Sequence, residues 1–252
     1  MIYNNKILRI NKHLEVEVQT SAELSESILV SLNDNKSAVY IHLNCCNYYD
    51  LKDKINTLKF PNRDIKYLFE GIGMKLFSAI LMGRWLMDCN GTDSFPLFIS
   101  KASKTNYRLF LLGATEEVIA RTADLLQANY PSLNIVGFNS GYFGDYQSGE
   151  IIKQINDAKA DILIIGRGME KELEFIQIAH SELKTKNIWC VGGLFDFIAQ
   201  NKPRAPFWIR QIRLEWLFRI IIEPQRLRKI IKAGFWTFKQ LLKSRINHGK
   251  TI

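Results

Sequence analysis

The feature of this sequence that most restricts its fold is a regular alternation, from residue 38 onward, of short β-branched or aromatic runs with segments of helical spacing. This alternation is typical of parallel βαβ units. We therefore predict an α/β fold with an open, mainly parallel, doubly wound sheet flanked by helices. The predicted strands cover 38–43, 67–69, 107–112, 134–138, 161–165 and 187–191, the predicted helices cover 75–87, 116–129, 149–158 and 170–185, and a strand pair and a helix precede them within the first 35 residues.

The composition favours a globular protein of the cytoplasm. The 252 residues are 47% apolar, which is enough for one to two domains with a real core. The four cysteines form no C-x-x-C pair, and the first twelve residues are too polar for a secretory leader, so we expect a reduced, cytoplasmic compartment. The sequence contains no run of 18 apolar residues, so we expect no membrane-spanning helix.

Three of the predicted strands run directly into glycine. At the carboxyl ends of parallel strands, glycine lets backbone N–H groups approach a phosphate closely. Glycines that only close tight turns are the alternative at each single position, whereas three such strand ends together favour a ligand site. None of them forms a G-x-G-x-x-G or P-loop motif, so neither a dinucleotide oxidoreductase nor a P-loop enzyme is indicated. The binding candidates in these turns are Gly113, Ala114, Gly166, Gly168, Gly192 and Gly193.

The last fifty residues, 203–252, carry the positive charge of the chain. They hold seven Arg and five Lys against two Glu, a net charge of +10, whereas the whole chain has +9, so the remaining residues sum to −1. The segment divides at Pro224 into two predicted helices, and the second has an apolar side with Trp236 on or near it and a basic side. We predict that it lies at a membrane interface. The alternative is an ordinary amphipathic helix packed on the sheet, with a solvated basic face.

A long ordered set of short motifs runs from about residue 38 to residue 230. The motifs include Leu43-Asn44, Gly71-Ile72-Gly73, Gly91-Thr92-Asp93, Val191-Gly192-Gly193, Phe195-Asp196-Phe197, Arg204-Ala205-Pro206, Leu214-Glu215-Trp216-Leu217, Glu223-Pro224 and Arg226-Leu227. In this order the set resembles the WecG/TagA/CpsF family of bacterial glycosyltransferases. The resemblance implies a Rossmann-like catalytic body, here 1–201, and a basic helical C-terminal appendage, here 202–252, that completes the active site and docks on the membrane.

The same resemblance implies an activity and its partners. It implies an inverting transfer of an N-acetylmannosamine-like sugar, or its uronate, from a UDP-sugar to a sugar on polyprenyl (undecaprenyl) diphosphate, during synthesis of cell-surface polysaccharide. Departures from the family pattern, given below, favour a neutral hexose or hexosamine for this chain. The partners expected are therefore the UDP-sugar, the lipid-linked acceptor and anionic lipid at the inner face of the cell membrane, where the protein is expected to lie peripherally. Apolar residues of the appendage also leave association with a second copy of the chain open.

An inverting transfer needs a carboxylate that takes the proton of the attacking hydroxyl. The family has an Asp in an Asp-Gly-x-Gly turn, and the matching residue here is Glu70, which we predict to be the base; a solvated strand-end carboxylate is the alternative. The sequence contains no Asp-x-Asp motif, so we expect neither a metal nor another cofactor. The charge of the UDP leaving group is instead expected to be stabilised by residues that match basic family positions. These are Arg219, Arg226 and Lys229.

Further positions match donor contacts of the family, or depart from them. Asn44 matches a donor-sugar contact, with a turn or cap residue as the alternative, and Thr92 and Asp93 suit either a sugar pocket or a helix N-cap. Three departures add acid and remove a cation, which disfavours an anionic uronate donor. They are His42 for the usual Thr, Asp88 for an Arg, and Glu170-Lys171-Glu172-Leu173 for Pro-Lys-Gln-Glu. The donor-binding candidates are thus Asn44, His42, Asp88, Thr92, Asp93, Lys171, Glu172 and Asp196, with the six strand-end residues named above.

Two alternatives to an active transferase remain open. The three departures allow a non-catalytic, membrane-docked relative that has lost transfer. The sequence pI of about 9.3 and the basic aromatic tail allow a nucleic-acid-binding protein. The body is near neutral, however, and contains no recognition module, so nucleic acid is not an expected partner.

Overall fold

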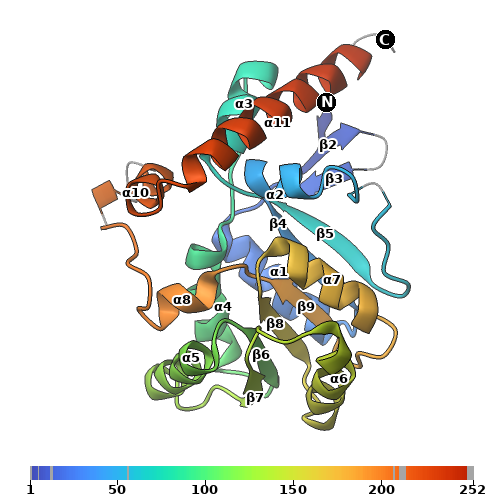
Figure 1. The fold of residues 1–252 in the computed structure, drawn as a ribbon. Coiled ribbons are helices and arrows are strands. Elements are labelled where there is room, and N and C mark those ends of the chain that lie inside the picture. Colours follow the sequence, from blue (N-terminus) through green and yellow to red (C-terminus); the bar gives the residue numbers. More distant parts are fainter. Residues whose placement is uncertain are drawn as a thin grey trace.

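The computed structural model describes residues 2–4, 6–11, 14–55, 57–206, 208–209 and 214–248, and the statements below concern these residues (Figure 1). The strands are β1 (Ile2–Asn4), β2 (Ile7–Asn11), β3 (Leu14–Glu17), β4 (Ala38–Leu43), β5 (Asp64–Phe69), β6 (Leu109–Gly113), β7 (Ile135–Asn139), β8 (Ile162–Gly166) and β9 (Asn187–Cys190). The helices are α1 (Ser21–Asn33), α2 (Cys45–Asp50), α3 (Ile72–Met82), α4 (Gly91–Ala102), α5 (Glu116–Asn129), α6 (Ser148–Asp157), α7 (Met169–Ala179), α8 (Leu194–Ile198), α10 (Glu215–Ile222) and α11 (Arg226–His248), with a short 3-10 helix, η1 (Asp145–Gln147), before α6.

The described strands form one sheet in the order β1-β2-β3-β5-β4-β9-β8-β6-β7. Pairing is antiparallel from β1 to β3 and parallel from β3 to β7. Every residue of β4, β6 and β8 is buried, as expected for central parallel strands covered on both faces. The predicted open, mainly parallel α/β sheet is therefore confirmed.

Helices cover both faces of this sheet (Figure 1). On one face, α2, α3, α6, α7 and α11 contribute to a core that includes Ile155 and Ile176. On the opposite face, α1, α4, α5 and α8 contribute to a core that includes Phe98 and Ile119. The two cores are separated by the sheet itself, which makes this a three-layer arrangement.

Strands β4 and β9 mark the place where the chain changes direction across the sheet. They pair in parallel, with Ala38 opposite Asn187 and Ile41 opposite Cys190. The helix that follows β4 is α2, which packs on one face, whereas the helix that follows β9 is α8, which packs on the other. Ligands of open α/β sheets bind in the crevice at the carboxyl ends of two such strands. The fold thus places a ligand site beyond Leu43 and Cys190.

Several helix boundaries differ from the predicted ones for local reasons. Helix α3 ends at Met82, not at residue 87, because Gly83 adopts a left-handed conformation with φ +66. The sequence pattern missed α2, which is too short for helical periodicity, and it missed the body of α4, which contains Pro96. It also missed one of the three short strands that precede α1.

Helix α11 lies on the body of the protein, beside α2, α3 and β2 (Figure 1). Its inner side is buried at Ala233, Thr237 and Leu241. Trp236, which the sequence suggested on or near the membrane side, instead packs edge-on against Tyr48 and Tyr49, with ring centroids 4.9 and 5.7 Å away. The predicted place of Trp236 is therefore wrong, because the helix is rotated so that this ring covers α2.

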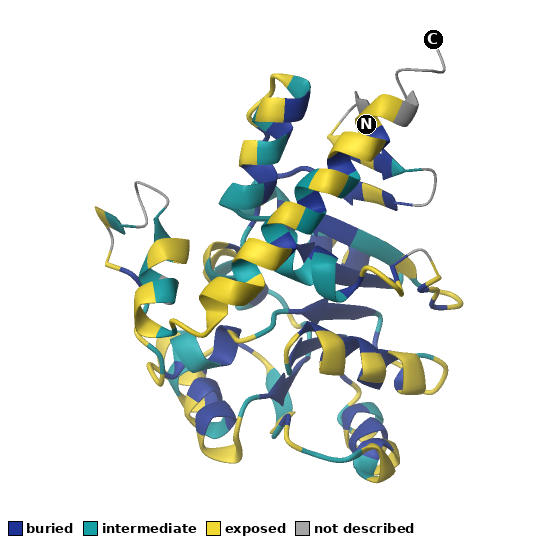
Figure 2. Cartoon of the chain, turned by 45° about the horizontal axis from the view of Figure 1, so that its top comes forward, coloured by how far each residue is buried: buried dark blue, intermediate teal, exposed yellow. Residues whose placement is uncertain are grey.

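The outer side of α11 is exposed (Figure 2). A row at helical spacing is exposed along it, formed by Leu227, Ile231, Phe235, Leu242 and Ile246. Phe235 is 73% exposed, so the body does not cover this row. The division of the chain at residue 201 stays a prediction, and α11 is in direct contact with the part assigned to the body.

Candidate active site

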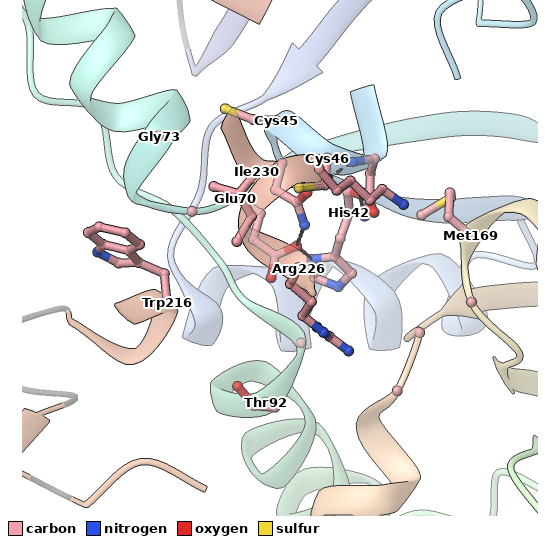
Figure 3. A pocket seen from close by; sticks show the side chains of 18 of the residues that line it. His42, Cys45, Cys46, Glu70, Gly73, Thr92, Met169, Trp216, Arg226 and Ile230 are labelled. Carbon is pink, nitrogen blue, oxygen red and sulfur yellow. Dashed lines mark hydrogen bonds and ion pairs between the residues drawn. The ribbon is translucent and has the colours of Figure 1, made fainter. Parts of the chain in front are cut away.

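A cavity of about 770 Å³ lies at the carboxyl ends of β4, β5 and β9 and extends to α10 and α11 (Figure 3). It occupies the crevice that the topology predicts. The candidates that line it are His42, Asn44, Glu70, Thr92, Gly168, Gly192, Gly193, Arg226 and Lys229. Nine of the sequence-predicted positions therefore meet around one space, although they come from segments far apart in the chain.

Glu70 and Asn44 meet in the wall of this cavity. Glu70 follows β5 directly, and its side chain is 20% exposed. The side-chain amide of Asn44 donates to Glu70 Oε2 at 3.4 Å, and Asn44 Oδ1 accepts from the backbone N–H of Asn47 at 3.0 Å, which caps α2. The cap alternative for Asn44 is thus confirmed. The same residue lines the cavity and contacts the predicted base, and its contact with a donor sugar stays a prediction.

His42 is held as a neutral ring behind this pair. Trp189 Nε1 donates to His42 Nε2 at 3.0 Å, so the proton of His42 is on Nδ1, which lies 3.2 Å from the carbonyl oxygen of Cys89. His42 Nδ1 also lies 3.7 Å from Glu70 Oε2. Burial lowers the pKa of His42. The ring therefore orients its neighbours as a neutral polar group and supplies no cation at neutral pH.

Asp88 accepts a hydrogen bond from the turn that carries Glu70. Gly71 has φ +88, and its N–H donates to Asp88 Oδ2 at 3.3 Å. Asp88 Oδ1 in turn accepts from the ammonium of Lys75 at 2.7 Å, and Lys75 is only 2% exposed. Asp88 is therefore one half of a buried ion pair. The cation whose loss the sequence suggested is replaced, because Lys75 enters the same neighbourhood from α3.

Cationic side chains line the opposite part of the cavity. Arg226 is paired with Glu223, and Lys229 Nζ lies 2.7 Å from Asp50 Oδ2. Lys202 also lines the cavity, and its Nζ lies 3.6 Å from Glu223 Oε1. This residue was not predicted, because in the sequence it marks only the start of the proposed appendage. The backbone of Arg219 lies in α10, but its side chain is outside the described residues, so its predicted role has no structural description.

Glu172 lies beneath the two glycine turns of the β8 and β9 ends. It is fully buried, and its Oε1 accepts from the backbone N–H groups of Arg167 at 3.0 Å, Gly168 at 3.2 Å and Gly192 at 2.8 Å. Burial raises the pKa of Glu172 to about 7, against the opposing effect of these hydrogen bonds. The prediction that Glu172 adds acid to the pocket is therefore wrong, because its carboxyl group supports the turns from behind.

Six other candidates lie outside the described lining of the cavity. One is Asp93, which lies in the first turn of α4, where Asn90 is the N-cap, and pairs with Arg204. Gly113 and Gly166 allow a close approach of backbones: a Cβ on Gly113 would lie 2.3 Å from the carbonyl oxygen of Gly166. Ala114 donates its N–H to that same oxygen at 3.2 Å. Lys171 is exposed on α7. Asp196, on α8, accepts a hydrogen bond from the side chain of Asn201. At Gly113 and Gly166 the absence of a side chain thus serves the close approach of two neighbouring strand ends, a role that the sequence did not suggest.

Three cysteines that were not among the predicted site residues also line the cavity. They are Cys45, Cys46 and Cys190, all free. Burial raises the pKa of Cys45 to about 12 and also raises the pKa values of Cys46 and Cys190, so none of these thiols is an activated nucleophile. Among the described residues, no three His, Cys, Asp or Glu side chains are grouped so as to hold a metal ion. Metal independence stays a prediction.

Comparison with known proteins places this arrangement in a family. A model described as Glycosyl transferase WecG/TagA/CpsF family matches residues 9–251, beyond both ends of the segment that the motifs mark. A relative from Bacillus subtilis (strain 168), named N-acetylglucosaminyldiphosphoundecaprenol N-acetyl-beta-D-mannosaminyltransferase, is 31% identical over 163 residues, which is 64% of this chain and 62% of the relative. A relative of the same name from Staphylococcus aureus (strain NCTC 8325 / PS 47) is 29% identical over 138 residues, 55% of this chain and 54% of the relative.

The aligned regions thus span less than two thirds of the length of these curated relatives. The family model and the relatives' names both describe glycosyltransferases, as the sequence resemblance predicts. The family match itself covers nearly the whole chain. The chain therefore belongs to the WecG/TagA/CpsF family of glycosyl transferases.

Proposed function

We propose that this protein is an inverting glycosyltransferase that moves a neutral N-acetylmannosamine-like hexosamine or hexose from a UDP-sugar to a sugar on polyprenyl diphosphate. The observation that carries this proposal is the placement of Glu70 and of three cationic side chains around the same cavity, whose lining also includes Asp50 and Glu223. Glu70 lines it at the sheet edge, and Lys202, Arg226 and Lys229 line its far side. The names of the relatives, which specify an undecaprenyl-diphosphate-linked acceptor, support the substrate class.

The proposed step uses Glu70 as general base. An acceptor hydroxyl attacks the anomeric carbon of the donor, its proton passes to Glu70, and the bond from that carbon to the UDP oxygen breaks on the opposite side of the ring. Glu70 Oε2 already accepts from Asn44, so Oε1 is the oxygen that we assign to the proton. Asn44 also restricts the orientation of the carboxylate, which keeps that oxygen directed into the cavity.

The leaving diphosphate needs positive charge, and the proposal assigns that charge to side chains. Arg226 and Lys229 come from α11, and both are more than 40% exposed at the side chain, which lets them move from Glu223 and Asp50 to a ligand. Guanidinium and ammonium donors at short range stabilise developing phosphate charge by the same electrostatic effect as a metal ion. We therefore propose that transfer requires no divalent metal.

We further propose that α10 and α11 rest on anionic lipid at the cytoplasmic face of the membrane. Among the described residues, no helix is long and apolar enough to cross a bilayer. The exposed row on α11 that contains Ile231 and Phe235 is flanked by exposed basic residues such as Lys232 and Lys239. Apolar residues beside Lys and Arg are the composition that binds an anionic membrane surface. This placement brings the cavity close to the membrane surface, where a lipid-linked acceptor is anchored.

The experiment that tests the activity is a UDP-release assay. Purified protein is incubated with candidate UDP-sugars and a short-chain polyprenyl-diphosphate-linked N-acetylglucosamine, with and without EDTA. We expect release that depends on the acceptor and is unchanged by EDTA. Release that requires added Mg²⁺ or Mn²⁺ would contradict metal independence, and no acceptor-dependent release with any donor would identify a non-catalytic relative.

Liposome flotation tests the membrane proposal separately. The double substitution Ile231→Ser with Phe235→Ser removes two exposed apolar side chains, so we expect weaker flotation with anionic vesicles and little change in thermal stability. Tyr142→Ser with Tyr146→Ser is the matched control, since both tyrosines are over 70% exposed in the segment between β7 and α6. Equal flotation of both variants and the unchanged protein would remove the docking surface from α11.

A further inference from the structure

A second cavity of about 190 Å³ adjoins the main one and shares part of its wall. Figure 3 shows Trp216 to the left of Glu70, Thr92 below it and Met169 of the main cavity to the right. Glu70 therefore borders two compartments of different size. The residues that line both are Glu70, Gly71, Ile72, Thr92 and Trp216.

The two compartments differ in charge. The described lining of the larger cavity balances Lys202, Arg226 and Lys229 against Asp50, Glu70 and Glu223. The described lining of the smaller cavity holds the carboxylates of Glu70, Asp88, Asp93 and Glu215, and its cation is Lys75, which lies 2.7 Å from Asp88 Oδ1. Arg204, outside that lining, pairs with Asp93. The smaller cavity is therefore the more acidic of the two, so a diphosphate is better accommodated in the larger one.

The remaining lining of the smaller cavity suits a neutral sugar ring. Carboxylate and amide oxygens accept hydrogen bonds from hydroxyl groups, and Asn90 and Thr92 add further polar atoms. Trp216 is 40% exposed and offers an apolar face next to these polar groups. An aromatic face with a few placed polar groups is the usual composition of a small-molecule site.

We propose that the smaller cavity is the subsite for the acceptor sugar, a neutral hexosamine ring whose attacking hydroxyl points to Glu70. This inference rests on the proposed transfer and adds the place of the second substrate. The nucleotide-sugar occupies the larger cavity, so the two rings meet on either side of one carboxylate. The new glycosidic bond forms as the bond to UDP breaks, and the proton of the acceptor hydroxyl goes to Glu70.

The buried pair of Lys75 and Asp88 is a positioning element for this subsite. Asp88 connects Gly71, which follows the base, to Lys75 on α3. Lys75 Nζ also lies 5.6 Å from the centre of the Trp85 ring, which further restricts it. The pair therefore sets the distance between Glu70 and the wall against which the acceptor ring lies.

The test compares substitutions confined to one cavity or the other. Glu215→Gln alters only the smaller cavity and keeps the shape of a partly exposed side chain at the start of α10. We expect it to raise the KM of a short-chain polyprenyl-diphosphate-linked N-acetylglucosamine about tenfold, because a hydroxyl loses a charged acceptor, while UDP affinity measured by calorimetry stays within about twofold. The matched control, Lys202→Gln, alters only the larger cavity and is expected to weaken UDP and spare the acceptor KM.

The double substitution Lys75→Met with Asp88→Asn provides a second, independent reading. It removes both charges at once, so no uncompensated buried charge is left to unfold the protein. We expect a lower kcat and a higher acceptor KM with unchanged UDP affinity. If Glu215→Gln and the double variant instead raise the KM of the UDP-sugar and leave the acceptor KM unchanged, the smaller cavity holds the donor ring and the assignment is overturned. Absence of transfer by the unchanged protein would overturn the proposed function itself, which is a different result.

Discussion

The two walls of the main cavity show how one residue type serves opposite purposes. At the β4–β5 wall, Glu70 is 20% exposed and its carboxylate meets the cavity beside Asn44. At the β8–β9 wall, Glu172 is fully buried and its carboxyl group accepts hydrogen bonds from three backbone N–H groups of the glycine turns. The first wall presents side chains to a ligand, and the second presents backbone. Burial, not residue identity, decides which acid is available for chemistry.

The largest expected effect comes from removing the exposed acid. Glu70→Gln keeps the size of the side chain but cannot accept a proton, so we expect kcat to fall by about 10²- to 10⁴-fold while UDP affinity is preserved. Single-turnover transfer and calorimetry with UDP measure the two quantities. Near-normal turnover would show that the wall of side chains does not contain the base, and the comparison between the two acids would lose its basis.

The second effect concerns the buried acid and appears in stability. The pKa of Glu172 is raised from about 4.5 to about 7, so the folded state binds the proton more tightly than the unfolded chain. This contribution to stability is complete below about pH 4.5 and is lost as the pH rises through 7, a change of roughly 3 kcal/mol. Glu172→Gln keeps an acceptor oxygen and removes the titration.

Urea unfolding of both proteins between pH 4.5 and 8.5 measures this change. We expect the free energy of unfolding of Glu172→Gln, relative to the unchanged protein, to increase with pH across this range. The basic group that acts on Glu172 is Arg167, and the carboxyl group of Glu172 in turn affects the thiol of Cys190 electrostatically, so Cys190→Ala in both backgrounds is the control. Parallel pH profiles would mean that Glu172 is ionised at no cost and that the two walls do not differ as described.

A smaller effect is expected at the residue that joins the fold to the base. Asn44→Ala removes the cap of α2 and the contact with Glu70, so we expect a loss of about 1 kcal/mol in stability and roughly a tenfold loss in kcat. Asn44→Ser separates the two roles because serine caps a helix but is too short to reach Glu70. Full activity of Asn44→Ser would show that the contact with Glu70 does not matter.

The smallest effect tests the backbone wall. Gly192 has φ +59, and a Cβ built on it meets no atom within 4 Å, so Gly192→Ala should cost only about 1 kcal/mol through its backbone conformation. Gly149→Ala in α6, where the added Cβ also meets nothing, should not destabilise the protein. Thermal unfolding measures both. A larger loss of UDP affinity than of stability in Gly192→Ala would indicate that the ligand lies directly against this turn.

Much of the site could be predicted from the sequence because the signals for it are local. Strand ends at Leu43, Phe69 and Cys190 follow from apolar runs, and carboxyl ends of parallel strands must share one edge of the sheet. The motifs then identified Glu70 and Asn44. Lys75 and Lys202 were missed because neither position has a local pattern that separates a buried or cavity-lining lysine from a solvated one.

The sequence by itself determined the α/β class, the mainly parallel sheet and the edge at which polar residues gather, because periodicity and strand-end glycines are properties of neighbouring residues. Only the tertiary structure decided which acids face the cavity. It buried Glu172 beneath two turns, paired Asp88 with Lys75, and turned Trp236 toward α2 while leaving Phe235 exposed. Burial and ion pairing depend on side chains that come from distant parts of the chain, so the charge of the pocket could not be read from composition.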